Sequence, residues 1–210
     1  MAAPITHIAL TEKVFDKLFK NKIKKDFFIG TLFPDIRYLK VINRDETHYN
    51  NLTVSNLKND ESFLAGVKFH SILDQTRERF ITKNNIYSLC PKSKYITQSL
   101  KILEDKIFYK NIKNPGIYAN YLNKILPVEK EYNILEKDLK KWHSLLQKYF
   151  RKQPNQNTIT NFILDIDFTE NIANEINKNI ATMRTNKKII EIIKNLYNNF
   201  DLLIIKDDKL

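Results

Sequence analysis

His70 and Asp74 are four residues apart in the chain, a spacing that places both side chains on one face of a helix. On that face they could share a metal ion or form a hydrogen bond across one turn. Four apolar residues that we expect to be buried surround the pair: Phe63, Leu64, Val67 and Leu73. Because a buried carboxylate needs a cation or several donors, the pair predicts either a metal ligand set or an ordinary His–Asp hydrogen bond.

Three residues earlier in the chain also have side chains that bind metals: His7, Asp35 and His48. We expect His7 in the first turn of the first helix and His48 in a loop. Asp35 directly follows Pro34, which ends an apolar helix. Taken singly, each of the three is more often a structural or solvent-exposed residue than a ligand.

The order of these residues is more specific than any one of them. The chain reads PxTHxxL, then FxxGxxxPD, then a loop histidine, then FLAGxxxHxxxD, with Gly30, Pro34 and Gly66 at the fixed positions. Over residues 1–80 this order resembles the zinc-dependent phospholipase C and single-strand nuclease superfamily. The resemblance implies an all-α bundle that holds zinc ions between its helices and hydrolyses phosphate esters.

Carried over to this sequence, the resemblance implies that Asp35, His48, His70 and Asp74 hold one zinc ion. His7 would hold a second ion, with Asp74 bridging the two. Manganese or iron could fit the same nitrogen and oxygen ligands.

The resemblance also implies a mechanism. A metal-bound water would become a nucleophile near neutral pH, and paired metals would hold a phosphoryl group between them. Asp35 would then also serve as a catalytic general base, and Arg37 or Arg44 in the same loop would bind the phosphate.

Two features depart from the superfamily pattern. Secreted members use an N-terminal tryptophan as a metal ligand, whereas this chain begins with Met1. They also carry a third metal site, whereas the single histidine after Asp74 is His143, which is followed four residues later by Gln147 and not by an acid. We therefore expect one or two metal ions, and we interpret His143 as a structural residue.

Three functions compete at this point. The first is a metal-dependent hydrolase that acts on a phosphodiester, in a phospholipid head group or a nucleotide. The second is a non-catalytic helical module that keeps a structural metal and binds a partner protein or an anionic surface. The third is a hydrolase similar to those that cleave the phosphopantetheine ester of acyl carrier protein, which also carry early His and Asp residues.

Helical periodicity runs through the chain without strand-type alternation, which predicts an all-α, multi-helix bundle with the metal site between its N-terminal helices. The expected helices span 6–24, 25–33, 61–81, 94–110, 115–126, 129–151, 159–184 and 187–204. Thr6 and Asp60 are the expected N-caps of the first and third helices. Ala65 and Gly66 permit a close neighbour, and residues 34–58 read as a loop with one short turn.

We expect a single domain over residues 1–210. The polar linker at 151–158 offers a possible division into a metal-binding bundle, 1–150, and a helical extension, 159–210. Asp165 and Asp167 lie after this linker, and we interpret both as polar positions of a helix, since residues two apart diverge there.

The overall composition excludes several classes of protein. The formal charge is +11 and the pI about 9.5, but the lysines are scattered, which favours a solvated surface over a dedicated polyanion site. With one cysteine, Cys90, the chain cannot form an intrachain disulfide. No apolar run approaches the roughly 20 residues that span a bilayer, and the start lacks the pattern of a signal peptide. A cytoplasmic location is expected, although export by a non-classical route would leave the same pattern.

Overall fold

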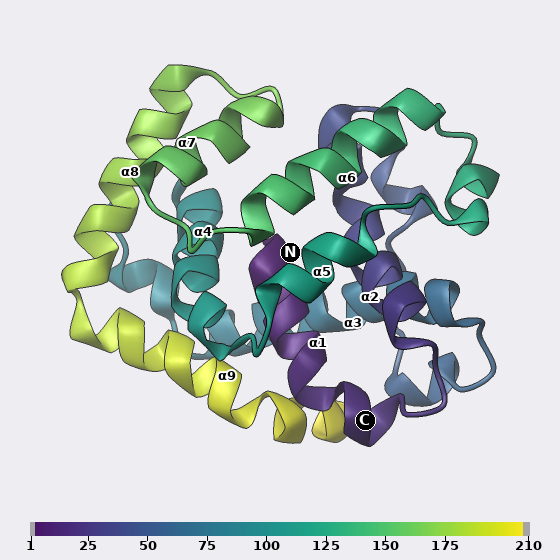
Figure 1. Cartoon of the computed structure of the whole chain (residues 1–210). Coiled ribbons are helices and arrows are strands. Elements are labelled where there is room, and N and C mark those ends of the chain that lie inside the picture. The colour runs from purple at the N-terminus through teal and green to yellow at the C-terminus, as the bar shows by residue number, and fades with distance from the viewer. Residues whose placement is uncertain (1–2, 208–210) are drawn as a thin grey trace.

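The computed structural model describes residues 3–207 (Figure 1). Within this range the chain forms α-helices and short 3-10 helices and no β-strand, so the all-α, multi-helix bundle is confirmed. The α-helices are α1 (Pro4–Leu18), α2 (Lys24–Leu32), α3 (Ser62–Lys83), α4 (Ile96–Phe108), α5 (Pro115–Tyr121), α6 (Glu136–Phe150), α7 (Gln156–Asp165), α8 (Glu170–Thr185) and α9 (Lys187–Asp207). The 3-10 helices are η1 (Phe33–Leu39), η2 (Arg44–Glu46), η3 (Val54–Leu57), η4 (Ile86–Leu89), η5 (Tyr109–Asn111) and η6 (Pro127–Tyr132).

Both expected N-caps are wrong, because each polar side chain has a different partner. Helix α1 starts before Thr6, whose hydroxyl donates a hydrogen bond to Asp105 Oδ1 at 2.7 Å. Helix α3 starts after Asp60, whose Oδ1 accepts a hydrogen bond from Lys68 Nζ at 2.8 Å. The partner of Thr6 thus lies in α4, whereas the partner of Asp60 lies in α3 itself.

Two of the expected long helices are interrupted where a residue takes a left-handed backbone conformation. Asn133, with φ 57°, separates η6 from α6, and Asp167, with φ 65°, lies in the turn between α7 and α8. L-residues in this conformation cannot continue a right-handed helix. The interpretation of Asp167 as a helical position is therefore wrong, whereas Asp165 is the last residue of α7. The expected loop 34–58 is also more regular than predicted, since it contains most of η1 and all of η2 and η3.

Helices α2 and α3 approach each other at two glycines. A Cβ added to Gly30 would overlap the carbonyl oxygen of Phe63, and one added to Gly66 would overlap that of Phe27. Only a residue without a side chain fits at these two positions. The close neighbour expected at Gly66 is thus α2.

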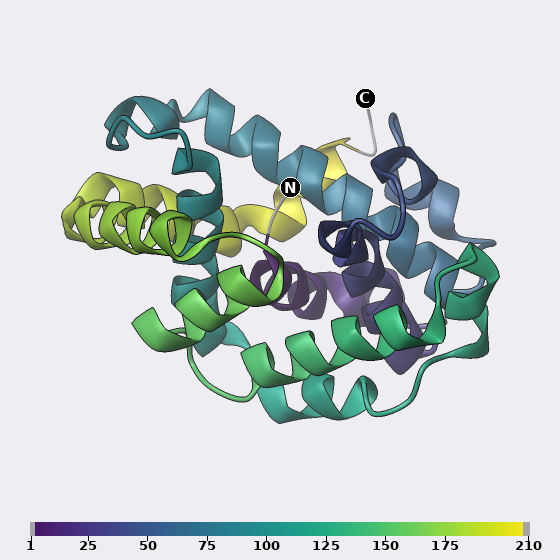
Figure 2. The same ribbon diagram turned by 90° about the horizontal axis from the view of Figure 1, so that it is seen from above.

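The C-terminal helices pack on the earlier ones. Helix α7 contacts α6, α8 contacts α4, and α9 lies against α1, α3 and α4. Figure 1 shows α1 in the middle of this arrangement and α9 along its lower edge, and the view from above in Figure 2 again shows α1 among the other helices. Buried apolar residues from both sides of the 151–158 linker belong to one continuous core.

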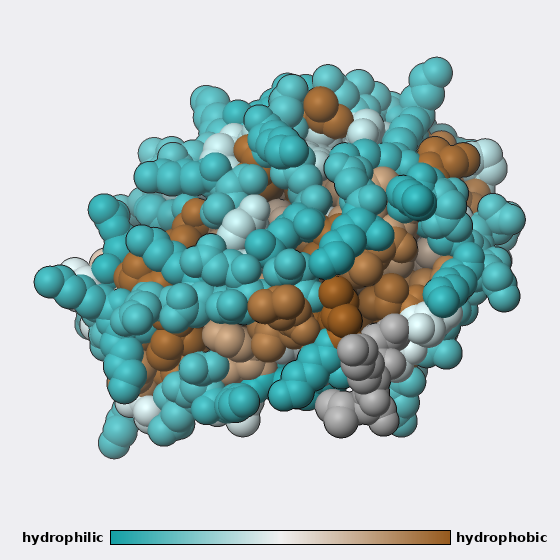
Figure 3. All heavy atoms as spheres, turned by 90° about the horizontal axis from the view of Figure 1, so that it is seen from below, coloured by the Kyte–Doolittle hydropathy of each residue, from teal (hydrophilic) through white to brown (hydrophobic). Residues whose placement is uncertain are grey.

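Figure 3 shows the face seen from below, where apolar side chains occupy strips between hydrophilic ones. No helix among residues 3–207 is both long enough and apolar enough to cross a bilayer.

Candidate metal centre

The five residues expected to bind metal meet in one buried cluster. His7 lies in the first turn of α1, Asp35 in η1, His48 just after η2, and His70 and Asp74 in the middle of α3. Potential ligand atoms of His7, His70 and Asp74 all lie within 4.8 Å of one another, and so do those of Asp35, His48 and His70. His48 is the most exposed of the five and retains only 7% of its accessible surface. The two groups share His70.

One carboxylate of the cluster faces two imidazole rings. Asp74 Oδ1 lies 3.3 Å from His7 Nε2, and Asp74 Oδ2 lies 3.5 Å from His70 Nε2. The rings of His7 and His70 are stacked, with centroids 4.0 Å apart and planes 12° from parallel. The His48 ring meets that of His70 edge-on at 4.9 Å. The two oxygens of Asp74 thus face two different imidazole rings.

A backbone carbonyl fixes each of the three rings. His7 Nδ1 lies 3.2 Å from the carbonyl oxygen of Ala3, and His70 Nδ1 lies 2.8 Å from that of Thr31. His48 Nδ1 lies 3.2 Å from the carbonyl oxygen of Arg44. It lies equally far from the hydroxyl of the adjacent threonine, which can accept as well as donate.

These contacts determine the tautomer. Because a carbonyl oxygen only accepts hydrogen bonds, each Nδ1 carries a hydrogen and each neutral ring keeps a lone pair on Nε2. The three Nε2 atoms are buried and make no well-formed hydrogen bond within residues 3–207. Metal-binding histidines are typically held in this way, with the second ring nitrogen bonded to a carbonyl or carboxylate.

The protonation of the cluster follows from burial and charge. Burial, together with the charge of His70, lowers the pKa of His7, and burial lowers the pKa of His48 to about 3. Burial also disfavours charge on His70, but Asp74 outweighs it and raises the His70 pKa. The pKa of Asp74 is held well below its usual value despite burial, because His70 and His7 lie beside it. A metal entering the site would take the place of the His70 proton.

The two arginines expected to bind phosphate lie in different surroundings. Arg37 Nη2 lies 3.5 Å from Asp35 Oδ1, and the guanidinium packs over the ring of Tyr38 at 4.5 Å. Arg44 has an exposed side chain and is tied to the cluster through its carbonyl oxygen, which holds His48. Arg37 therefore contacts a residue of the cluster, whereas the Arg44 side chain is exposed to solvent and its charge contributes to the lowered pKa of His48.

The remaining histidine has both ring nitrogens engaged elsewhere. His143 Nδ1 donates to the carbonyl oxygen of Leu122 at 3.0 Å, and its Nε2 lies 2.7 Å from Glu129 Oε2. It links α6 to the preceding segment. This geometry agrees with its interpretation as a structural residue.

Sequence reasoning missed the carbonyl groups that orient the rings. Thr31 is the clearest example, because its carbonyl oxygen reaches His70 across the α2–α3 contact. Backbone acceptors have no residue signature. The one sequence signal for this contact is the pair Gly30 and Gly66, which allows the two helices to approach closely.

Comparisons with known proteins show no family for this chain. No family model matches it, and no solved structure matches it significantly. The chain is similar to the RecBCD enzyme subunit RecD of Buchnera aphidicola subsp. Schizaphis graminum, with 29% identity over 175 residues. That match covers 81% of this chain but only 26% of the RecD subunit. The resemblance to zinc-dependent phospholipases and nucleases therefore depends on the ordered residues of the cluster alone.

Proposed function

We propose that this protein is a metal-dependent hydrolase of phosphoric esters, with zinc held by His7, Asp35, His48, His70 and Asp74. One observation carries the proposal. Each of the three histidines bonds through Nδ1 to a backbone carbonyl, so that its buried Nε2 is the nitrogen that can bind a metal, within a group that also holds two carboxylates.

The residues fit such a metal by ligand type. Imidazole nitrogens and carboxylate oxygens together suit zinc, and also manganese or iron. When bound, these ions supply Lewis acidity, which lowers the pKa of a coordinated water and polarises a phosphoryl oxygen. Burial strengthens every charge interaction in the site, because little water is present to screen it.

The chain's own residues supply the other functions. Asp35 offers a carboxylate that can accept a proton from the attacking water, and Arg37 beside it offers a guanidinium to a phosphate oxygen. The substrate would be a phosphodiester, in a phospholipid head group or a nucleotide. The formal charge of +11 favours the approach of such an anion.

The burial of the cluster favours a second candidate function. All five residues are at least nine-tenths buried, which is typical of a structural metal that clips helices together. In that case the protein would bind its metal without hydrolysing anything.

Metal analysis and a hydrolysis assay separate the two functions. The untagged protein would be analysed by mass spectrometry for metal, with His70→Ala as the test variant and His143→Ala as the matched control outside the cluster. We expect one or two equivalents of zinc in the wild type and in His143→Ala, and a loss in His70→Ala. Absence of metal after zinc is supplied would overturn both functions.

The hydrolysis assay uses a chromogenic phosphodiester with zinc present. The hydrolase predicts turnover that disappears in Asp74→Ala. Bound metal without turnover, together with a lower melting temperature after chelation, would establish the structural role instead. Turnover that survives in Asp74→Ala would place the active site elsewhere.

A further inference from the structure

A cavity adjoins the candidate metal cluster on the side of Asp35. Its volume is about 40 Å³, and its walls come from the N-terminal end of α1, from η1, and from α4, α6, α7 and α8. Apolar side chains dominate these walls, among them Trp142, Ile166 and Ile176. Lys101 of α4 is also among the residues that line the cavity. The helices beyond residue 150, to which the sequence assigns no role, thus contribute directly to the surroundings of the cluster.

Lys101 is an unusual residue for such a place. It is only 7% exposed and is the sole buried lysine among residues 3–207. It forms no ion pair within 4.0 Å and no hydrogen bond through its Nζ with any residue in that range, whereas the nearby Arg77 is paired with Glu104. A buried ammonium without a close partner is costly unless an anion joins it.

The charge around Lys101 depends on whether a metal occupies the cluster. Burial, and then the charge of Arg77, lowers the pKa of Lys101, whereas the carboxylates of Asp35, Asp74 and Glu104 favour its charged form. A single zinc ion balances the carboxylates of Asp35 and Asp74. Lys101 and Arg37 then form an excess of positive charge beside the cluster, which a phosphate group would neutralise.

The size of the cavity limits what can accompany the phosphate. A water needs roughly 10–15 Å³ on this measure, whereas a cavity that binds benzene is about 150 Å³. The space of about 40 Å³ therefore admits a short aliphatic segment and is too small for a nucleobase.

We propose that Lys101 and this cavity form a subsite for an aliphatic phosphate ester. Lys101 Nζ donates a hydrogen bond to a phosphate oxygen, and the first carbons of the alkyl group lie between Trp142, Ile166 and Ile176. This inference builds on the proposed function, since the metal would hold the other phosphate oxygens. It selects the lipid-like substrate over the nucleotide.

Calorimetric titration of the zinc-supplemented protein tests the subsite. The probes are inorganic phosphate, ethyl, butyl and hexyl phosphate, and adenosine monophosphate. Affinity for the alkyl series should rise by roughly fourfold for each methylene that enters the cavity. Adenosine monophosphate should bind no better than inorganic phosphate.

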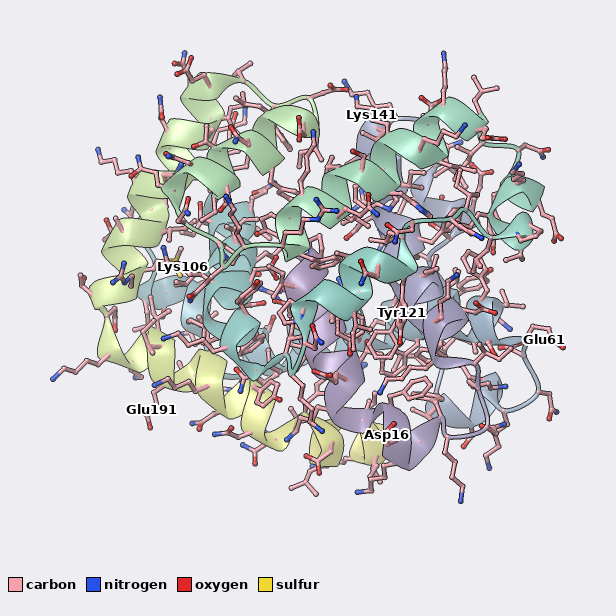
Figure 4. All side chains as sticks on the ribbon, in the orientation of Figure 1. Asp16, Glu61, Lys106, Tyr121, Lys141 and Glu191 are labelled. Carbon is pink, nitrogen blue, oxygen red and sulfur yellow. The ribbon has the colours of Figure 1, made fainter. Side chains whose placement is uncertain are left out.

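Three variants separate the charge from the cavity. Lys101→Met removes the charge at nearly constant length and should weaken every phosphate probe by about tenfold or more. Lys101→Arg should retain most of the affinity. Ile166→Phe should fill the cavity and abolish the gain with chain length while leaving inorganic phosphate unchanged. Lys106→Met is the matched control, because Lys106 lies on the same helix but lines a different pocket (labelled in Figure 4).

Metal content and melting temperature, measured on the same samples, allow the Lys101 subsite and the metal-dependent hydrolase to be tested separately. Unchanged phosphate affinity in Lys101→Met, an absent chain-length effect in the wild type, or tight binding of adenosine monophosphate would each overturn the subsite even if zinc binds and hydrolysis occurs. Should Lys101→Met fail to fold, Ile166→Phe and the chain-length series still decide. A wild-type protein that holds no zinc and no hexyl phosphate would overturn both.

Discussion

The close contact between α2 and α3 should control the metal site, and Gly66→Ala tests this directly. A Cβ at Gly66 would overlap the carbonyl oxygen of Phe27 and lie 2.9 Å from the backbone nitrogen of Thr31. Non-bonded carbon contacts are favourable at about 3.5–4.0 Å, so α2 must move away by about 1 Å. The atoms that oppose the new methyl group belong to the backbone and cannot rotate aside.

This displacement reaches the cluster through Thr31. The carbonyl oxygen of Thr31 now accepts a hydrogen bond from His70 Nδ1 at 2.8 Å. A shift of about 1 Å along that direction would lengthen the distance from His70 Nδ1 to the Thr31 oxygen beyond about 3.2 Å, the usual limit for an N–H···O hydrogen bond. Loss of such a partner typically costs about 10–100-fold in metal affinity. Overpacking of the helix contact should also cost about 1–3 kcal/mol of stability.

Competition with a chromogenic chelator would measure the zinc affinity, and urea unfolding of the metal-free protein would measure the stability. Gly116→Ala in α5 is the control, because a Cβ there meets only the Asn114 side chain at 3.3 Å. We expect Gly116→Ala to behave as the wild type. If Gly66→Ala binds zinc with wild-type affinity and unfolds at the wild-type urea concentration, the account of how α2 orients His70 is wrong.

Three further predictions concern the core and its charges. Arg77→Met should cost about 3–5 kcal/mol in urea unfolding, because Glu104 loses its buried bidentate partner, and adding Glu104→Leu should recover most of this. Burial raises the pKa of Asp105 to about 7 in the folded protein, against 3.8 when unfolded. Protonated Asp105 therefore contributes fully to the free energy of unfolding below pH 3.8, and this contribution, roughly 4 kcal/mol at most, is lost as the pH rises to about 7. Asp105→Asn should accordingly flatten the pH dependence of the free energy of unfolding. Chelation should lower the free energy of unfolding by about 2.7 kcal/mol if free zinc had been at 100 times its Kd. An unchanged melting temperature would mean that the folded protein binds no metal.

The sequence was informative about the cluster because its members follow simple rules. The four-residue spacing of His70 and Asp74 puts them on one helix face, and the apolar residues around them predict burial. Pro34 marked the end of the α-helical segment only approximately, because α2 ends at Leu32 and the chain continues through Pro34 and Asp35 as the 3-10 helix η1. For His7 and His48 the separate signals were weak, and only the order of the whole set selected them.

Other features depend on contacts between distant segments and had no local signal. Thr6 has the side chain of an N-cap, yet it bonds to Asp105, which is 99 residues away. Asn133 and Asp167 stop two helices through left-handed backbone conformations that many residue types can adopt near a turn. Lys101 could not be distinguished from the other lysines by sequence, because its burial depends on tertiary packing around α4, against which α8 lies.

Helix α4 connects the two halves of the proposed site. Lys101 and Asp105 are four residues apart on it and thus share a face. The Asp105 carboxylate accepts hydrogen bonds from the backbone nitrogens of Ile5 and Thr6 and so fixes the first turn of α1, where His7 lies. If both proposals hold, one face of α4 would position the metal ligand His7 through Asp105 and would supply a phosphate-binding cation, Lys101. This arrangement explains why the candidate site needs helices well beyond the residues that carry the resemblance.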